Sequence, residues 1–160
     1  ILGQVGDGFK VAMKVLDRGR LTMGSVCVGA AQRLLELSVG HAKQRVQFGK
    51  PIAEQQAIQF MLADTAVEIY GCRTMLHQVA RRVDLGERLT KEVAMVKLAC
   101  SEMVGRAADR AVQIHGGMGY MRECPVERYY RDVRLIRLYE GTSEIQRLII
   151  AREILGREFA

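Results

Sequence analysis

Apolar residues that recur every three or four positions constrain the fold of this chain more than any other feature of its sequence. This spacing places side chains on one face of an α-helix, and the alternation typical of β-strands never persists. The clearest stripe consists of Val93, Val96, Cys100, Met103, Ala107, Ala111 and Ile114. Two others consist of Ile58, Met61, Leu62, Thr65, Ala66 and Ile69, and of Val26, Ala30, Leu34 and Leu37. Each stripe needs an apolar partner, so the sequence predicts an all-α fold of long, mutually packed helices.

Glycine and proline residues mark where these helices begin and end. In chain order, the predicted helices cover residues 8–18, 20–46 with closure by Gly49 and Pro51, a stretch after Pro51, a stretch ending at Gly116-Gly117, a short stretch after Pro125, and 143–155. The residues of the last helix that we expect to face inward are Ile145, Leu148 and Ile149. The simplest arrangement is an up-and-down four-helix bundle with additional short helices, forming one domain over residues 1–160.

Small residues occupy many stripe positions, where they allow helices to approach closely. They include Gly24, Gly29, Ala30, Ala31, Ala107, Ala108 and Ala111. From the residues alone, close contacts inside the core are the favoured interpretation, and a helix-mediated subunit contact is the alternative.

Composition and charge exclude several classes of protein. Hydrophobic residues make up 49% of the chain and charged residues 26%, and no apolar run approaches the roughly 20 residues that span a bilayer. The net charge is +6, but basic and acidic residues are interspersed and only 6% of residues are aromatic, so no nucleic-acid partner is expected. The spacing of the four cysteines matches no metal motif, which predicts reduced, buried thiols and no metal site.

One carboxylate lies in a turn directly before the last predicted helix. Glu140 is followed by Gly141, and a carboxylate held in such a turn can act as a base. The ordinary interpretation is different: Ser143 caps the helix, Gln146 three residues later completes a capping box, and Glu140 is a loop acid. The spacing alone leaves both interpretations open.

Three segments carry a resemblance to a known family. They are residues 45–51 (RVQFGKP), 113–120 (QIHGGMGY) and 139–146 (YEGTSEIQ). In order and separation they resemble the C-terminal helical domain of the acyl-CoA dehydrogenase family, and the resemblance covers essentially the whole chain. It implies a longer protein in which an N-terminal helical domain and a middle β domain precede this one.

The resemblance also implies an activity. FAD is the expected cofactor and an acyl-CoA thioester the expected substrate, which is dehydrogenated to a trans-2-enoyl-CoA. The expected partners are an electron-transfer flavoprotein, as electron acceptor, and further copies of the chain in a homodimer or homotetramer. The expected location is the cytoplasm of a bacterium or the mitochondrial matrix of a eukaryote. The alternatives are an acyl-CoA oxidase and a catalytically silent helical oligomerisation module.

On the substrate side, the resemblance makes Glu140 the catalytic base, with Gly141 beside the thioester. Asp17 and Arg20 match a stretch that borders the acyl-CoA in relatives, although their spacing equally suits an ion pair on one helix. A subset of the family carries its base at the position of Gly19, which has no side chain to serve. That absence favours Glu140 as the base.

On the cofactor side, the resemblance assigns ten residues to FAD. They are Arg45, Phe48, Gln56, Gln113, Ile114, His115, Gly116, Gly117, Thr142 and Glu144. Without the resemblance, Arg45 is explained as a cation that a helix C-terminus favours. The glycine-rich loop at residues 113–117 is then explained as a helix C-cap. The family arrangement places this loop against the FAD of a neighbouring subunit.

Overall fold

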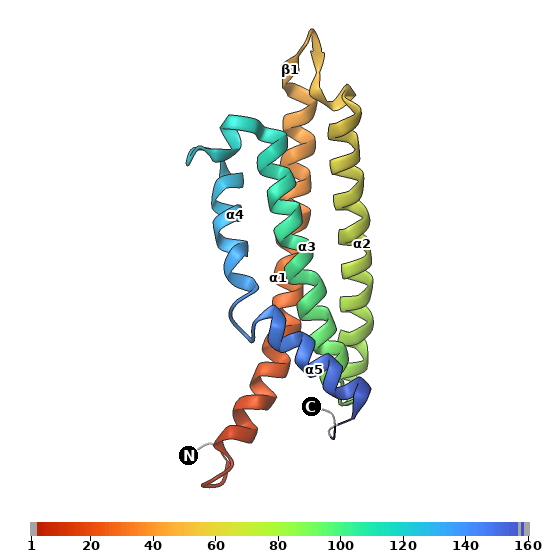
Figure 1. The fold of residues 1–160 in the computed structure, drawn as a ribbon, viewed down its shortest axis with the longest axis vertical. Coiled ribbons are helices and arrows are strands. Elements are labelled where there is room, and N and C mark those ends of the chain that lie inside the picture. Colours follow the sequence, from red (N-terminus) through yellow and green to blue (C-terminus); the bar gives the residue numbers. More distant parts are fainter. Residues whose placement is uncertain (1–2, 157, 159–160) are drawn as a thin grey trace.

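Five α-helices and a small hairpin make up the part of the chain that the computed structural model describes, residues 3–156 and 158. The helices are α1 (Gly8–Gln44), α2 (Gln56–Asp84), α3 (Thr90–His115), α4 (Pro125–Ile136) and α5 (Ser143–Leu155). Short 3₁₀ turns, η1 (Ile52–Glu54) and η2 (Gly116–Tyr120), follow the hairpin and α3. Figure 1 shows α1 to α4 running alternately up and down, with α5 across the lower end of the bundle. The predicted all-α, up-and-down bundle is confirmed.

The first helix differs from the prediction, because residues 8–18 and 20–46 do not form separate helices. A single 37-residue helix, α1, covers both, continues through Gly19 and ends at Gln44, two residues before the predicted end. A glycine inside a helix costs about 1 kcal/mol relative to alanine, which weakens the helix but removes no backbone hydrogen bond.

The chain after α1 forms a hairpin, which the sequence pattern did not predict. Strand β1 (Val46–Gln47) pairs antiparallel with β2 (Lys50–Pro51). The two residues between them, Phe48 and Gly49, have positive φ values of +54° and +80°. Two consecutive positive φ values are typical of a tight two-residue hairpin turn, so Gly49 closes a hairpin instead of a helix.

Helix α3 supplies the centre of the core, as its stripe predicts. All seven residues of the stripe from Val93 to Ile114 are buried. The first six share one core cluster with Leu34 of α1 and Ile69 of α2, and Ile114 lies in a second, smaller cluster with Ala42 and Ile52. Val26 was expected to face the core but is 46% exposed, because the buried face of α1 passes through Cys27, Ala31 and Leu34.

Gly24 marks the closest approach of α1 to the other long helices. A Cβ atom at this position would lie 2.6 Å from Cγ1 of Val96 and 3.3 Å from Cδ1 of Leu76. The small residue therefore serves a core contact, as expected. Gly29, by contrast, is exposed and has nothing within 4 Å of its Cβ position.

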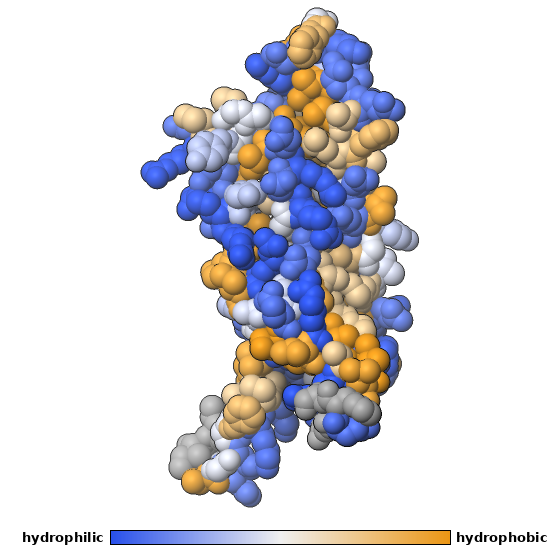
Figure 2. Space-filling view, viewed as in Figure 1, coloured by the Kyte–Doolittle hydropathy of each residue, from blue (hydrophilic) through white to orange (hydrophobic). Residues whose placement is uncertain are grey.

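Helix α5 turns a polar face to the bundle, so two of the three expected inward positions were wrong, whereas Ile149 is half-buried. Ile145 and Leu148 are exposed, whereas Ser143 and Gln146 are buried. Figure 2 shows apolar side chains gathered on the outer surface near α5. The reason lies in the turn before α5, whose carbonyl groups accept hydrogen bonds from Gln146.

The four cysteines are free and buried, as predicted. Burial raises the pKa of the Cys27 thiol to about 12, which keeps it protonated. Within the described residues, no cluster of three or more acidic, histidine or cysteine side chains could hold a metal ion. None of the helices described there is long and apolar enough to cross a membrane.

Candidate functional site

The turn between α4 and α5 has a strained backbone. Glu140 and Gly141 both have positive φ, +58° and +89°. Glycine adopts this conformation freely, whereas for a residue with a Cβ it costs about 1–2 kcal/mol. Such strain persists only where surrounding contacts determine the backbone.

The capping arrangement before α5 differs from the capping box considered above. Thr142 is the N-cap, and its hydroxyl accepts a hydrogen bond from the Ile145 N–H at 3.3 Å. The Ser143 hydroxyl instead donates to Glu102 of α3 at 2.6 Å. The strained turn leads into α5 so that Thr142, and not Ser143, is the last residue before the helix. The box is thus absent, and Gln146 is free for other contacts.

Three side chains from three helices donate to the two carbonyl groups of this turn. Arg20 Nε of α1 donates to the Glu140 carbonyl at 3.2 Å, and Lys97 Nζ of α3 donates to the Gly141 carbonyl at 2.7 Å. Gln146 Nε2 of α5 donates to both carbonyls, at 3.1 and 3.0 Å. The turn is thereby tied to the centre of the bundle.

The Glu140 carboxylate lies against α1 at Gly19. A Cβ atom at position 19 would lie 2.6 Å from Oε2 of Glu140 and 2.9 Å from Oε1. Oε2 is buried and has no hydrogen-bond partner among residues 3–156 and 158. Burying a carboxylate oxygen without a hydrogen bond costs free energy. Such unpaired oxygens are therefore unusual outside sites where the group has a chemical role. It also explains why the helix carries glycine here: the carboxylate takes the place of a side chain.

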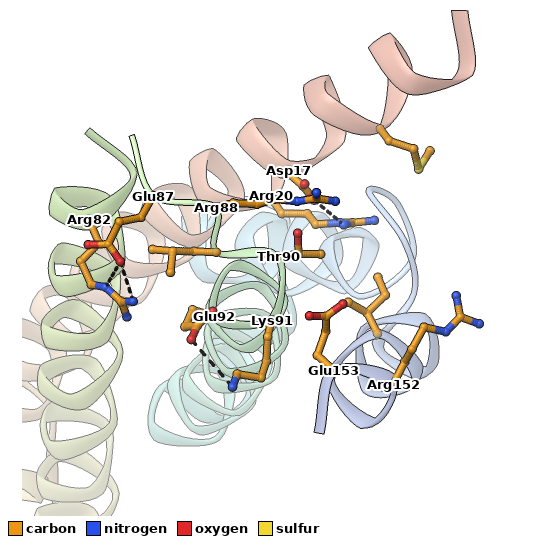
Figure 3. Close-up of a pocket in the computed structure, with 13 residues that line it drawn as sticks. Asp17, Arg20, Arg82, Glu87, Arg88, Thr90, Lys91, Glu92, Arg152 and Glu153 are labelled. Carbon is orange, nitrogen blue, oxygen red and sulfur yellow. Dashed lines mark hydrogen bonds and ion pairs between the residues drawn. The ribbon is translucent and has the colours of Figure 1, made fainter. Parts of the chain in front are cut away.

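Arg20 connects the turn to an open cleft of about 1100 Å³. Figure 3 shows Asp17 and Arg20 of α1 at one side of the cleft and Arg152 and Glu153 of α5 at another. Arg20 is buried and pairs with Asp17 at 2.9 Å, so the ion pair that their spacing left open is present. Glu140 does not line the cleft. Arg20 reaches its carbonyl from the rim.

A second, half-buried network supports the turn from the α3 side. Glu102 accepts hydrogen bonds from Arg137 at 3.1 Å and from Ser143 at 2.6 Å. Burial alone would raise its pKa, but these hydrogen bonds and the positive charge of Arg137 outweigh burial and lower the pKa of Glu102. The Ser143 N–H also donates to the Arg137 carbonyl, 3.2 Å away. The end of α4 is thus joined to the start of α5.

Lys97, Glu102 and Gln146 are structural partners of the turn that the sequence analysis did not identify. One signal was available for Lys97, because it lies four residues after Val93 and three before Cys100, on the buried stripe of α3. A lysine on such a stripe needs a buried partner.

The residues expected at FAD lie at both ends of the bundle. Thr142 and Glu144 lie beside Glu140 at the lower end. At the upper end in Figure 1 lie the end of α1, the hairpin, the start of α2 and the end of α3. The expected residues in these upper segments are Arg45, Phe48, Gln56, Gln113, Ile114, His115, Gly116 and Gly117.

The upper cluster is exposed except for two members. Arg45, Gln56 and Phe48 are exposed, Phe48 to 94%. Ile114 is buried with Ala42 and Ile52, so its side chain faces the protein.

His115 is the other member with restricted exposure. Its ring stacks on that of His41 at 4.3 Å, and its Nδ1 lies 2.8 Å from the Ala111 carbonyl oxygen. Gly116 follows with a φ of +59° and ends α3. The loop is therefore a helix C-cap with exposed glycines, and this geometry is compatible with both interpretations given above.

Comparison with known proteins identifies the family. Residues 6–155 match the model of the acyl-CoA dehydrogenase C-terminal domain. The chain is 45% identical over 157 residues to acryloyl-CoA reductase (NADH) of Anaerotignum propionicum and 47% identical over 155 residues to human mitochondrial short-chain specific acyl-CoA dehydrogenase. These matches cover 98% and 97% of the chain but only 40% and 38% of the relatives.

A solved structure agrees in both fold and sequence. The butyryl-CoA dehydrogenase of Megasphaera elsdenii matches 96% of this chain and 40% of its own, with a TM-score of 0.93 and 39% identity. The chain thus spans about two fifths of the length of these relatives. On sequence and on structure alike, it belongs to the acyl-CoA dehydrogenase family and corresponds to the C-terminal domain of that family.

Proposed function

We propose that this domain supplies the base for FAD-dependent α,β-dehydrogenation of an acyl-CoA thioester, and that the base is Glu140. One observation carries the proposal: the Glu140 carboxylate is held in a strained turn by donors from three helices, yet its own Oε2 has no partner among the described residues. The donors bind the carbonyls of Glu140 and Gly141, and Oε2 of Glu140 keeps its capacity to accept a proton, as a positioned base requires.

Dehydrogenation of an acyl-CoA thioester requires two kinds of protein group. A base must accept the α-proton of the thioester, and donors must stabilise the charge that develops on the thioester oxygen. Glu140 can serve both, because its carboxylate can accept the proton and its N–H makes no hydrogen bond within the described chain. A flavin, when bound, supplies the acceptor for the β-hydride. Arg20 then holds the Glu140 carbonyl, so that the carboxylate stays in place as its charge is neutralised.

The exposed upper cluster fits part of an FAD site. Arg45 offers a cation suited to a pyrophosphate, and Phe48 an exposed ring beside it. Arg20 lies in α1 and Arg45 is the C-cap residue at its end, 25 residues further along the chain, which separates the two by about 38 Å at 1.5 Å per residue. A single flavin dinucleotide does not extend between these two ends. This separation supports a homodimer or homotetramer in which one chain's Arg45 end completes the Glu140 site of another.

Two alternatives remain to be tested against the proposal. A silent oligomerisation module has no need of an unpaired buried carboxylate in a strained turn, and this observation favours the dehydrogenase. An acyl-CoA oxidase would use the same base and differ only in how the flavin is reoxidised. We propose an electron-transfer flavoprotein as acceptor, and turnover sustained by oxygen alone would favour the oxidase.

The test uses the holoenzyme, by which we mean the FAD-loaded protein that joins this chain to the N-terminal helical and middle β domains expected from the resemblance. Glu140→Gln should keep the fold and the flavin but slow bleaching of the flavin by acyl-CoA by about 10²–10⁴-fold, because an amide cannot accept the proton. Glu36→Gln, on the exposed side of α1, is the matched control and should bleach at the parent rate. Bleaching of Glu140→Gln at the parent rate would remove Glu140 from the mechanism.

A further inference from the structure

Lys97 is a buried lysine with a specific backbone partner. It is 1% exposed, in the first half of α3, and its Nζ donates to the Gly141 carbonyl at 2.7 Å, a distance typical of a charge-assisted hydrogen bond. Burial lowers the pKa of the Lys97 ammonium, whereas nearby groups, including the carboxylates of Glu102 and Glu140, favour its charged form. An apolar side chain of similar length would fill the same space without this desolvation. The lysine is therefore better explained by its hydrogen bond than by packing.

Gln146 makes the same kind of contact from the opposite helix. It is fully buried, its Nε2 donates to the carbonyls of both Glu140 and Gly141, and its Oε1 is buried without a partner in the described chain. The two acceptors determine which way the amide points, because the reversed amide would set its oxygen against two carbonyl oxygens. A buried amide whose oxygen has no hydrogen-bond partner lowers the stability of the fold. The hydrogen bonds of Gln146 to the turn are therefore made at a cost in stability.

The space around Gly141 is matched to these donors. A Cβ atom at position 141 would lie 2.7 Å from Nε2 of Gln146 and 3.7 Å from a guanidinium nitrogen of Arg20. Glycine thus allows both the positive φ and the close approach of the amide. Neither Lys97 nor Gln146 lines the cleft that Arg20 borders. Any influence of these two residues on a substrate must pass through the backbone of the turn.

We propose that Lys97 and Gln146 are positioning residues that hold the Glu140-Gly141 turn in its left-handed conformation and so aim the Glu140 carboxylate. This proposal rests on the proposed function of Glu140. The backbone at residue 140 sets the direction of its side chain, and the carboxylate has no hydrogen bond of its own at Oε2 to hold it. Its direction therefore depends on the two buried donors together with Arg20.

The test compares Lys97→Met with Ser101→Ala in the holoenzyme. Methionine keeps the length and the apolar stem but removes the donor. Ser101 is the matched control, because it is buried one turn further along α3 and its hydroxyl donates within that helix, to the Leu98 carbonyl at 3.1 Å. Four quantities are measured: FAD content, KM for the acyl-CoA, the single-turnover rate of flavin bleaching, and the isotope effect of deuterium at the α-carbon.

A fifth measurement does not depend on activity. The Ser143 N–H donates across the turn to the Arg137 carbonyl at 3.2 Å, so exchange of this amide hydrogen reports opening of the turn. Lys97→Met should increase its exchange rate at least about 10-fold, whereas Ser101→Ala should leave it at the parent value. If Lys97→Met does not fold, Gln146→Met takes its place in every measurement.

The proposal expects Lys97→Met to bleach about 100-fold more slowly than the parent, with FAD content and KM little changed and a larger isotope effect, because proton transfer becomes slower. A parent-like isotope effect would show a merely structural role and overturn the proposal, as would parent-like exchange at Ser143. If the parent holoenzyme itself fails to bleach, the proposed function fails. Ser143 exchange then still decides whether these residues hold the turn.

Discussion

Replacing Gly19 by alanine should separate stability from activity, because the two respond with opposite signs. Gly19 lies in the interior of α1 and faces the Glu140 carboxylate. Alanine is favoured over glycine in a helix by about 1 kcal/mol, chiefly through backbone entropy. The new methyl group, however, would occupy space that the carboxylate now fills.

The displacement follows from the geometry. The Cβ atom would lie 2.6 Å from Oε2 of Glu140, whereas ordinary contact begins at 3.4 Å, so the carboxylate must move by about 0.8 Å. The far end of a glutamate moves at little cost in free energy, so most of the helix stabilisation should remain. A displacement of about 1 Å at a reacting group can slow a reaction about 100-fold. We therefore expect Gly19→Ala to raise the melting temperature by about 2–4 °C and to slow flavin bleaching by about 100-fold.

The assay pairs thermal unfolding with single-turnover bleaching of the holoenzyme. Gly29→Ala is the control, because Gly29 also lies in α1 but has open space at its Cβ position. It should gain the same stability and keep the parent rate. Parent-like bleaching in Gly19→Ala would refute the close contact between position 19 and a working carboxylate. A lowered melting temperature would refute the claim that the carboxylate yields easily.

Three further predictions concern the helix cap at Thr142, the half-buried carboxylate of Glu102 and the isolated chain. Thr142→Ala should lower the free energy of unfolding by about 1 kcal/mol in denaturant titrations, because the Ile145 N–H loses its acceptor. The lowered pKa of Glu102 stabilises the fold above its ordinary value of 4.5, and this contribution is lost as the pH falls through the lower folded pKa. Unfolding midpoints of the parent and Glu102→Gln should therefore converge as the pH falls below 4.5 and through the lower folded pKa. The isolated chain should be helical by circular dichroism and self-associate in sedimentation, yet show no dye-linked dehydrogenase turnover with added FAD. A purely monomeric or an active chain would contradict the last prediction.

The fold was predictable where packing follows periodicity, and less so where a single residue decides the local geometry. The prediction that all seven residues of the α3 stripe are buried is confirmed, because a central helix is buried at regular intervals along its whole length. The break expected near Gly19 was wrong, because glycine weakens a helix without removing a hydrogen bond. The hairpin was missed because it needs a positive φ at Phe48, and a phenylalanine rarely adopts one.

The candidate site shows the same division. Glu140 could be singled out from its turn and its neighbouring segments, but its surroundings could not. The choice of Thr142 over Ser143 as helix cap depends on Glu102, which is 41 residues from Ser143 in the chain. The contact of Lys97 with Gly141 spans 44 residues. Pairings of this kind depend on how helices are placed in space, which local patterns do not specify.

The cost of building the site is concentrated around Glu140. Within the described residues, three buried side-chain atoms lack a hydrogen-bond partner: Arg137 Nε, Glu140 Oε2 and Gln146 Oε1. All three flank one turn, whose central residue also carries backbone strain. Elsewhere in the described core, buried polar side chains such as Ser38 and Thr65 are satisfied by their own helix. A fold selected for stability alone would not place every such defect of its described residues around one turn, and we infer that the function of the carboxylate in that turn maintains them there.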